Sequence, residues 1–533
     1  MERNDTQKTL ATWFNFKFRL LIGGIVVGLL SGSVVVLFRF VLEESLERVL
    51  EFYHYQLRHM WIVPLWFVIL VIVGWVTGMT VKKQPAISGS GIPQVKAVLQ
   101  NKLNMNWWKA LTAKFLGGAI SIGSGLSLGR EGPSIQIGAL TAQGFSRLMS
   151  KSKTEENILI TCGASAGLAA AFNAPIAGVI FALEEIHLNF SPLILIASLA
   201  SSLVADFVSK EFFGMSPVFH FMNVGPVPLN QYVHLLILGI IVGIMGVVFN
   251  KSIYAFQDFY LKMTWLPAPY RPILPFVMSG ALGLSMPLLL GGGNGLVNDL
   301  ITDSFSLKFL LVILILKFLF TMFSYGSSAP GGIFLPMLVI GALIGVMYSK
   351  FINGLWGMPV LSESSFLILA MAGYLTASLK APITGIILIT EMTGNFTNLL
   401  STGVVCLVAY MTAELFRSHP VYEVLLERFL HQRKASGETE QSSSKVILEV
   451  PILQGSRLDG TQIKDFQWPA HCLIVSVKRG SDEKIPDGQM LLLAGDYLNI
   501  LTSDRHAAYV HDCLKEPAGQ STDWIQGIPN EKT

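Results

Sequence analysis

The stretch Gly129-Arg130-Glu131-Gly132-Pro133 lies inside a run of small and apolar residues at 121–140, SIGSGLSLGREGPSIQIGAL. Little in such a run can solvate the carboxylate of Glu131, and an ionisable residue at membrane depth indicates a functional site. Pro133 can open a helix, because the N–H groups of a first turn have no partner within the helix. That helix would direct free N–H groups and the positive end of its dipole at the carboxylate, or at an anion that replaces it. The alternative is that Arg130 and Glu131 form an ordinary charge pair at the membrane interface.

Two more glycine-rich breaks have the same form. Residues 88–93 (SGSGIP) precede one helical stretch, and residues 329–336 (APGGIFLP) precede another. A single break is a weak indication, because glycine and proline are common in membrane helices. Three of them in one hydrophobic chain predict interrupted helices whose N-termini converge on an anion near the membrane midplane.

The segments SGSGIP, GREGP and GGIFLP, in this order, resemble the three signature segments of the CLC chloride channels and chloride/proton antiporters. The resemblance covers roughly residues 20–430. It implies an all-α polytopic membrane protein with the CLC fold, in which two inverted repeats contain the broken helices. It also implies a homodimer in a lipid bilayer, with chloride and protons as the transported species.

The composition excludes an ordinary soluble protein. Of the 533 residues 52% are apolar and only 14% are charged, whereas charged residues make up about a quarter of a typical soluble domain. The net charge of +3 is too small to indicate a nucleic-acid partner. The four cysteines and ten histidines follow no disulfide or metal-ligand spacing, so we expect free thiols, no metal and no cofactor.

The hydrophobic stretches are numerous, and several are too short or too interrupted to cross a bilayer alone. Residues 1–19 precede the first of them and are polar, without the pattern of a cleaved signal peptide. Basic residues at both ends of the hydrophobic region favour a cell-membrane protein with cytoplasmic N- and C-termini. The stretches are 20–40, 61–80, 108–128, 135–148, 158–183, 192–213, 233–256, 273–290, 307–323, 333–351, 366–389 and 404–416.

An internal repeat is visible in the sequence, with halves at about 20–215 and 230–425. Two long halves with breaks at matching positions are typical of a duplicated transporter. The matched pairs are Pro175/Pro382 and Glu184/Glu391 at an offset of 207, Gly129/Gly332, Pro133/Pro336 and Gly138/Gly341 at 203, and Gly89/Gly293 and Gly91/Gly295 at 204. The resemblance adds that the halves are inverted in the membrane.

The composition changes after the hydrophobic region. Residues 431–445 are polar and serine-rich, as in a linker. Short apolar runs at 446–451, 472–477, 490–493 and 497–501, followed by a predicted helix at 503–514, indicate a small α+β domain at 446–520, with a tail at 521–533. This part resembles the TrkA-C (RCK-C) domain of potassium-transport regulators. The alternative to a regulatory role is a cytoplasmic appendage that stabilises a dimer.

The resemblance implies that backbone N–H groups and hydroxyls hold chloride without a full positive charge, which keeps binding weak enough for release. Ser90 would supply one hydroxyl and Tyr422 the second. An interfacial aromatic anchor is the alternative role for Tyr422. The chloride-binding residues implied are Ser90, Gly91, Ile92, Gly129, Arg130, Gly132, Ile333, Phe334 and Tyr422.

Two glutamates match the family's proton-handling positions. Glu131 would be the gating glutamate, whose carboxylate blocks the anion path and swings away when protonated. Glu185 matches the internal proton glutamate of the antiporter branch, a position at which CLC channels commonly lack an acid. The alternative is that Glu184 and Glu185 cap a helix, and the repeat partner Glu391 suggests this structural role for Glu184.

The predicted function is therefore secondary active exchange of chloride for protons. Ser90 is the chloride-type residue, whereas proline there marks nitrate-preferring relatives and fluoride exporters depart from the serine loop. Lys114 resembles the family's buried lysine. A passive chloride channel gated by voltage or pH is the second prediction. A membrane enzyme is the third and is disfavoured, because no nucleophile, metal-ligand set or nucleotide motif accompanies Glu131 and Glu185.

A regulatory ligand is predicted for the domain after residue 446, at a twofold interface. TrkA-C domains pair, and some bind cyclic dinucleotides such as cyclic di-AMP. Ile474 and Val475 would contact a base, Lys478 and Arg479 would meet phosphates, and Pro486 would shape the pocket wall. A short basic pair at a solvated strand end is the alternative.

Overall fold

The structure is a computed structural model that describes residues 2–188, 190–219, 221, 225–302, 304–356, 362–435, 445–480, 482–515 and 518. The chain divides into two compact units, and the division falls between residues 438 and 439, within the predicted linker. Residues 436–444 of that linker and the predicted tail at 521–533 lie outside the described residues.

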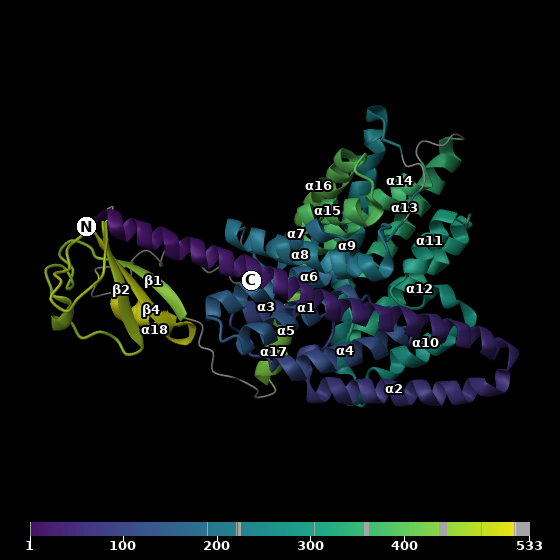
Figure 1. The fold of residues 1–533 in the computed structure, drawn as a ribbon, viewed down its shortest axis with the longest axis horizontal. Coiled ribbons are helices and arrows are strands. Elements are labelled where there is room, and N and C mark those ends of the chain that lie inside the picture. Colours follow the sequence, from purple (N-terminus) through teal and green to yellow (C-terminus); the bar gives the residue numbers. More distant parts are fainter. Residues whose placement is uncertain are drawn as a thin grey trace, which may run out of the picture. The chain divides into compact units, whose positions relative to one another are not determined.

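The first unit is helical, and its order of elements repeats (Figure 1). Eight helices in the first half are followed by eight matching helices in the second half, and α17 (Val421–Ala435) comes last. The first half contains α1 (Glu2–Arg58), α2 (Val63–Lys83), α3 (Ile92–Leu99), α4 (Trp107–Gly123), α5 (Glu131–Leu148), α6 (Lys153–Phe172), α7 (Pro175–Phe181) and α8 (Pro192–Phe213). The second half contains α9 (Tyr232–Lys262), α10 (Ile273–Ser285), α11 (Asn294–Thr302), α12 (Leu307–Gly326), α13 (Phe334–Trp356), α14 (Glu363–Leu379), α15 (Pro382–Thr393) and α16 (Leu399–Leu415).

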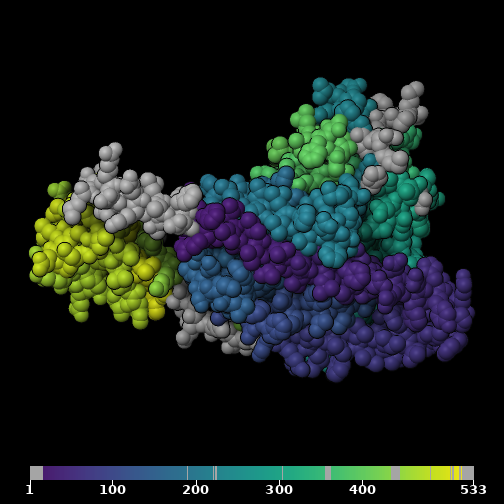
Figure 2. All heavy atoms as spheres, viewed as in Figure 1, coloured from purple at the N-terminus to yellow at the C-terminus, as the bar shows by residue number. Residues whose placement is uncertain are grey.

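Six segments of the described chain are long and apolar enough to cross a membrane. The remaining helices are shorter or less apolar, as the interrupted hydrophobic stretches predicted. Along α1, which runs across the face seen in Figure 2, and along α2, large apolar side chains such as Leu29, Phe40 and Leu65 are exposed. Such a surface suits contact with lipid, so these observations support a multi-pass membrane protein.

Two apolar stretches are continuous in the sequence but form two helices each in the structure: 158–183 and 366–389. α6 ends at Asn173 and α14 at Lys380, both in the left-handed conformation with φ of 52° and 60°. A left-handed residue ends a helix, and a proline at the first helical position then begins α7 and α15. The chain therefore turns at matching positions in the two halves.

The halves meet through a reciprocal backbone contact at the sequence-matched glycines Gly129 and Gly332. The N–H of each donates to the carbonyl of the other, with N···O distances of 2.7 Å. The pair forms an antiparallel bridge. Antiparallel pairing of equivalent residues is what a twofold relation between the halves produces, and it agrees with the predicted inverted repeats.

The predicted register of the first glycine pairs is wrong by two residues. Gly91 precedes α3 with φ of 93°, and its counterpart before α11 is Gly293 with φ of 100°. Gly89 and Gly291 have φ of 59° and 63°. The correct offset is therefore 202. A run of glycines at 291–295 allows the Gly-x-Gly spacing to match twice in the sequence, and only the backbone conformation distinguishes the two.

Two buried lysines hold these loops. Lys114 Nζ donates to the carbonyls of Ile87 and Gly89 at 2.9 and 2.7 Å. In the second half, Lys317 Nζ donates to Leu289 and Gly291 at the same two distances. An unpaired amine buried in this way would be costly, so the carbonyl pair explains why a lysine is tolerated. Lys114 thus fixes the loop that leads into Ser90.

The first residues of the predicted linker are helical, because α17 continues to Ala435. The segment 431–435 (HQRKA) contains no proline or glycine, and basic residues near a helix C-terminus interact favourably with its dipole. The linker predicted from residue 431 is thus not linker over its first five residues.

The second unit is a four-stranded antiparallel sheet with strand order β1-β4-β2-β3, followed by α18 (Asp504–Lys515). This arrangement confirms the predicted small α+β domain. The apolar run at 490–493 forms only an isolated bridge from Leu491 to Gln462, while Leu492 enters the core. The strands are β1 (Lys445–Pro451), β2 (Cys472–Arg479), β3 (Asp482–Lys484) and β4 (Asp496–Ser503).

Candidate functional site

The three glycine-rich breaks meet in the first unit. A Cβ on Gly132 would lie 2.7 Å from the carbonyl oxygen of Ser90, and a Cβ on Gly332 would lie 3.1 Å from the carbonyl oxygen of Gly129. Only glycine permits these backbone approaches. The N-terminal ends of α3, α5 and α13 are therefore brought together, as the sequence predicted.

Glu131 is the first residue of α5 and is fully buried. Its Oε2 accepts the N–H of Leu335 at 3.4 Å, and the N–H groups of Arg130 and Glu131 also approach the carboxylate. Oε1 has no hydrogen-bond partner within the described part of the chain. The carboxylate thus occupies a place between the starts of α5 and α13 that is suited to an anion.

Gly129 leaves the room that this carboxylate needs. A Cβ on Gly129 would lie 2.1 Å from Oε2 of Glu131, closer than any side chain could tolerate. The same glycine makes the reciprocal bridge to Gly332. Gly129 therefore takes part both in the contact between the halves and in the placement of the Glu131 carboxylate.

Ser90 and Tyr422 place two hydroxyls in the buried interior of the unit. Ser90 Oγ accepts the N–H of Ile92 at 3.4 Å. Tyr422, near the start of α17, is fully buried, unlike an interfacial anchor, and lies within electrostatic range of Glu131 and Glu185. Its hydroxyl has no partner among the residues that the structure describes. Buried hydroxyls without a partner are uncommon, which makes Tyr422 a candidate for binding a ligand.

The start of α13 is positioned by aromatic packing. Phe334 lies between Phe172 and Phe181, with ring centroids at 5.7 and 5.9 Å, and Ile333 beside it is fully buried. Sequence reasoning named Ile333 and Phe334 as donors but missed Leu335, whose N–H reaches Glu131. The second residue of a helix has a free N–H, so the boundary of α13 would have revealed it.

Tyr325 was also missed by sequence reasoning. A Cβ on Gly89 would lie 3.1 Å from the Tyr325 hydroxyl, and this hydroxyl interacts with Ser90. Tyr325 is a buried residue in the last turn of α12. In such an apolar stretch an aromatic residue is ordinarily part of the core. The pattern around it therefore gave no signal.

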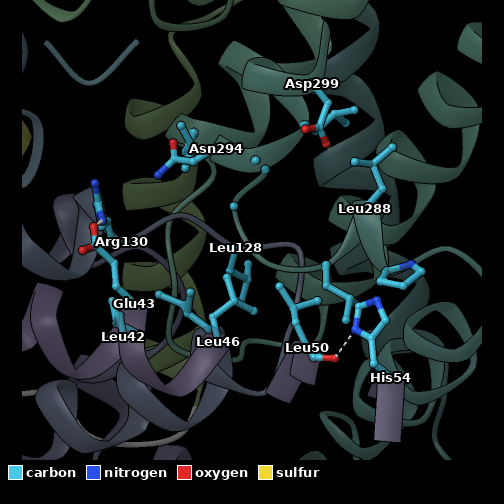
Figure 3. Close-up of a pocket in the computed structure, with 18 residues that line it drawn as sticks. Leu42, Glu43, Leu46, Leu50, His54, Leu128, Arg130, Leu288, Asn294 and Asp299 are labelled. Carbon is cyan, nitrogen blue, oxygen red and sulfur yellow. Dashed lines mark hydrogen bonds and ion pairs between the residues drawn. The ribbon is translucent and has the colours of Figure 1, made fainter. Parts of the chain in front are cut away.

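The side chain of Arg130 turns toward Glu43, which also pairs with Arg39 at an N···O distance of 3.0 Å. In Figure 3, Arg130 and Glu43 lie side by side at one end of a cavity of about 280 Å³, in which leucine is the most frequent lining residue. The guanidinium is paired to Glu43, and Arg130 acts on the carboxylate of Glu131 through both its charge and its backbone N–H.

The adjacent glutamates at 184 and 185 point to different partners from a π-helical turn, η3 (Ala182–His187). Glu184 accepts the N–H of Thr384 at 2.8 Å, at the start of α15. Glu391 accepts the N–H of Ala177 at 2.8 Å, at the start of α7. Each half therefore caps a helix of the other half, which confirms the predicted structural role of Glu184.

Glu185 forms a buried ion pair instead. Its Oε1 lies 2.9 Å from Nζ of Lys96 on α3, and both side chains are almost completely buried. Sequence reasoning missed Lys96. A lysine within the apolar segment QVKAVL was the available signal, since a buried lysine requires a partner.

In the second unit, two of the predicted ligand residues, Ile474 and Arg479, also make contacts within the domain. The guanidinium of Arg479 forms a two-point ion pair with Asp496, with N···O distances of 2.7 Å, and donates to the carbonyl of Leu491. The hydrogen bonds to Asp496 raise the pKa of Arg479. Arg479 therefore helps to hold the domain together, while about a third of its side chain stays exposed. Ile474 packs against the core and is partly exposed.

The other predicted ligand residues are accessible. Val475 and Lys478 are exposed and Pro486 is half-buried. Val475 falls where the pairing of β2 with β4 is irregular, between Ile474 and Ser476. An extra residue in a strand displaces the alternation of its side chains, which the sequence alone did not reveal.

Comparison with known proteins matches each of the two units to a protein family. The family described as "Voltage gated chloride channel" matches residues 71–414. The chain belongs to the CLC family. The TrkA-C domain family matches residues 447–513, so this CLC protein carries a TrkA-C domain at its C-terminal end.

Several CLC proteins are similar over most of the chain. The H(+)/Cl(-) exchange transporter ClcA of Vibrio parahaemolyticus is 32% identical over 429 residues, covering 78% of this chain and 91% of the relative. ClcA of Salmonella typhi is 34% identical over 379 residues, or 70% and 80% of the two chains. A crystal structure of a slow cyanobacterial Cl⁻/H⁺ antiporter has a TM-score of 0.73 and 32% identity, covering 78% of this chain and 99% of the other. A eukaryotic CLC transporter, at 21% identity and a TM-score of 0.65, shares the fold.

Proposed function

We propose that this CLC protein is a secondary active antiporter that exchanges chloride for protons across the cell membrane. The observation that carries the proposal is the buried Glu131 carboxylate at the joined starts of α5 and α13, combined with a second buried acid at Glu185. The names of the ClcA relatives and of the cyanobacterial structure support the same activity.

In the proposed mechanism, chloride and the Glu131 carboxylate compete for one set of backbone N–H groups. An ionised carboxylate fills this place, and protonation removes its charge and lets chloride replace it. The hydroxyls of Ser90 and Tyr422 hold the ion further along without a full positive charge, so release stays easy. Glu185 exchanges protons with the cytoplasm and supplies them to Glu131.

The second candidate is a passive chloride channel of the same family, gated by voltage or pH, because channels and antiporters share the anion site. The buried acid at Glu185 favours antiport, since the resemblance associates it with the antiporter branch. The reversal potential in liposomes decides between the two. With equal chloride on both sides, a pH gradient should shift the reversal potential of an antiporter, and an unshifted value would establish the channel.

Ser90→Pro is expected to shift the preference from chloride to nitrate. The substitution deletes a hydroxyl at the start of α3 and stiffens a loop between two glycines of positive φ. A hydrogen bond to a charged group contributes about 1.5–3 kcal/mol, so chloride affinity should fall about tenfold or more. Reversal potentials in chloride/nitrate mixtures measure this. Ser88→Ala is the control, and unchanged selectivity in Ser90→Pro would mean that Ser90 does not face the ion.

The assembly and orientation are part of the proposal. A homodimer is typical of the family, and the basic residues that flank the hydrophobic region favour cytoplasmic N- and C-termini. Protease protection of tags at the two ends, in sealed vesicles of known orientation, tests the orientation.

Regulation by a nucleotide such as cyclic di-AMP, at a twofold interface of TrkA-C domains, completes the proposed function. The candidate contacts are Ile474, Val475, Lys478, Arg479 and Pro486, of which Val475 and Lys478 are exposed. We expect cyclic di-AMP to bind the full-length protein and change its chloride flux, and Lys478→Gln to weaken both effects. Calorimetry with cyclic di-AMP and ATP measures the binding, and Lys484→Gln on β3 is the matched control. No heat and no change in flux with either nucleotide would reduce the domain to a structural appendage.

A further inference from the structure

The ion pair between Lys96 and Glu185 joins two parts of the proposed site. Lys96 lies one helical turn beyond Ile92 on α3, the short helix that begins directly after the Ser90 loop. Glu185 lies on η3, which packs against α3. The N···O distance is 2.9 Å, and the exposed fractions of the two side chains are 1% and 6%. Two charges at this depth interact strongly, because little solvent screens them.

The second half of the chain provides an internal comparison. At the offset of 202 that relates α3 to α11, the counterpart of Lys96 is Asn298. At the offset of 207 that relates Glu184 to Glu391, the counterpart of Glu185 is Met392. Both counterparts are uncharged, whereas the helix caps Glu184 and Glu391 are retained in both halves. The architecture of a half therefore does not require the ion pair, and a purely structural role explains it poorly.

The surroundings of Glu185 make Lys96 its only cationic neighbour within the described part of the chain. Glu184 on its own element and Glu423 on α17 act on it with negative charge, and Tyr422 on α17 lies within its electrostatic range. From α6, Thr161 contacts His187 at the end of η3. The negative charges of Glu184 and Glu423 disfavour the ionised form of Glu185, whereas the positive charge of Lys96 favours it.

We propose that Lys96 is the positioning residue of the internal glutamate: it fixes Glu185 and sets the pH at which Glu185 takes up its proton. This inference rests on the proposed antiport. Protonation of Glu185 removes one charge of the pair and leaves Lys96 buried without its counter-ion. Because Lys96 lies on the short helix that begins directly after the Ser90 loop, proton uptake at Glu185 acts on the anion loop through α3.

The test measures chloride and proton fluxes in liposomes as a function of pH. In Lys96→Met the carboxyl loses the cation that opposes its protonation, so proton flux should reach half-maximum at a higher pH. A counter-ion at this distance shifts protonation by roughly one to three pH units, and a shift of at least about one unit is expected. Lys96→Arg keeps the charge and should retain the original profile. Lys210→Met, which removes the cation of an ion pair on α8, is the matched control.

A double variant separates positioning from structure. If Lys96 acts through Glu185, adding Lys96→Met to Glu185→Gln should leave the chloride flux of Glu185→Gln unchanged. The inference is overturned if Lys96→Met lowers chloride and proton fluxes in the same proportion with an unchanged pH profile. It is also overturned if the double variant loses chloride flux. Unmodified protein without any proton flux would instead refute the proposed antiport, so the two failures are distinguishable.

Discussion

Glu131→Gln is expected to abolish proton-coupled transport and to leave a chloride flux that no longer responds to pH. A glutamine keeps the size of the side chain, but it cannot ionise and cannot carry a proton. The N–H groups of Arg130, Glu131 and Leu335, which approach the carboxylate, would then face chloride without a charged competitor. Proton and chloride fluxes in liposomes across a range of pH measure the effect.

The control for this experiment is Glu44→Gln, which neutralises an exposed acid that pairs with Arg48 on α1. It should preserve the coupling and the pH dependence of the unmodified protein. Proton movement that survives in Glu131→Gln would show that another group carries the proton at the anion site.

Glu185→Gln is expected to retain chloride movement and to lose proton movement. The substitution leaves the starts of α5 and α13 untouched, but it removes the acid that supplies protons. It also leaves Lys96 buried without a counter-ion. Breaking one side of a buried ion pair typically costs about 3–5 kcal/mol, so the thermal stability of the variant should fall as well. Paired chloride and proton electrodes on one liposome preparation measure both fluxes.

The neighbouring glutamate is the matched control for Glu185→Gln. Glu184 caps α15 and has no contact with Lys96 among the described hydrogen bonds and ion pairs. Glu184→Gln should keep proton coupling and lose stability by about 1 kcal/mol, the usual effect of a weakened cap. Equal loss of proton coupling in the two variants would contradict the separate roles assigned to these adjacent residues.

The sequence was sufficient for the features that rest on strong local chemistry. A carboxylate between glycines and a proline, as at Glu131, has few structural explanations in an apolar run. The match between Glu184 and Glu391 in the internal repeat was visible because each glutamate lies at the same distance along the chain from its matching proline. These signals gave the fold class, the convergence of three helix N-termini and the duplication.

What the sequence could not supply depends on contacts between distant segments. Lys96 and Lys317 look alike as single lysines in apolar helices, yet one pairs with a carboxylate and the other with two carbonyls. Nothing local to Arg479 indicates that Asp496, seventeen residues later on a neighbouring strand, holds its side chain. The glycine run at 291–295 matched two registers until its φ angles were known.

The exchanged helix caps bear on how such a protein arose and assembles. The start of α7 is capped by Glu391 and the start of α15 by Glu184, so neither half contains the group that completes its own broken helix. A half made alone would leave these N–H groups without their carboxylate, and the loss of a helix cap costs about 0.5–2 kcal/mol. An ancestor with a single repeat would have gained the same caps by pairing with an identical chain. In the present chain, the cap of each broken helix forms only when the two halves have packed together.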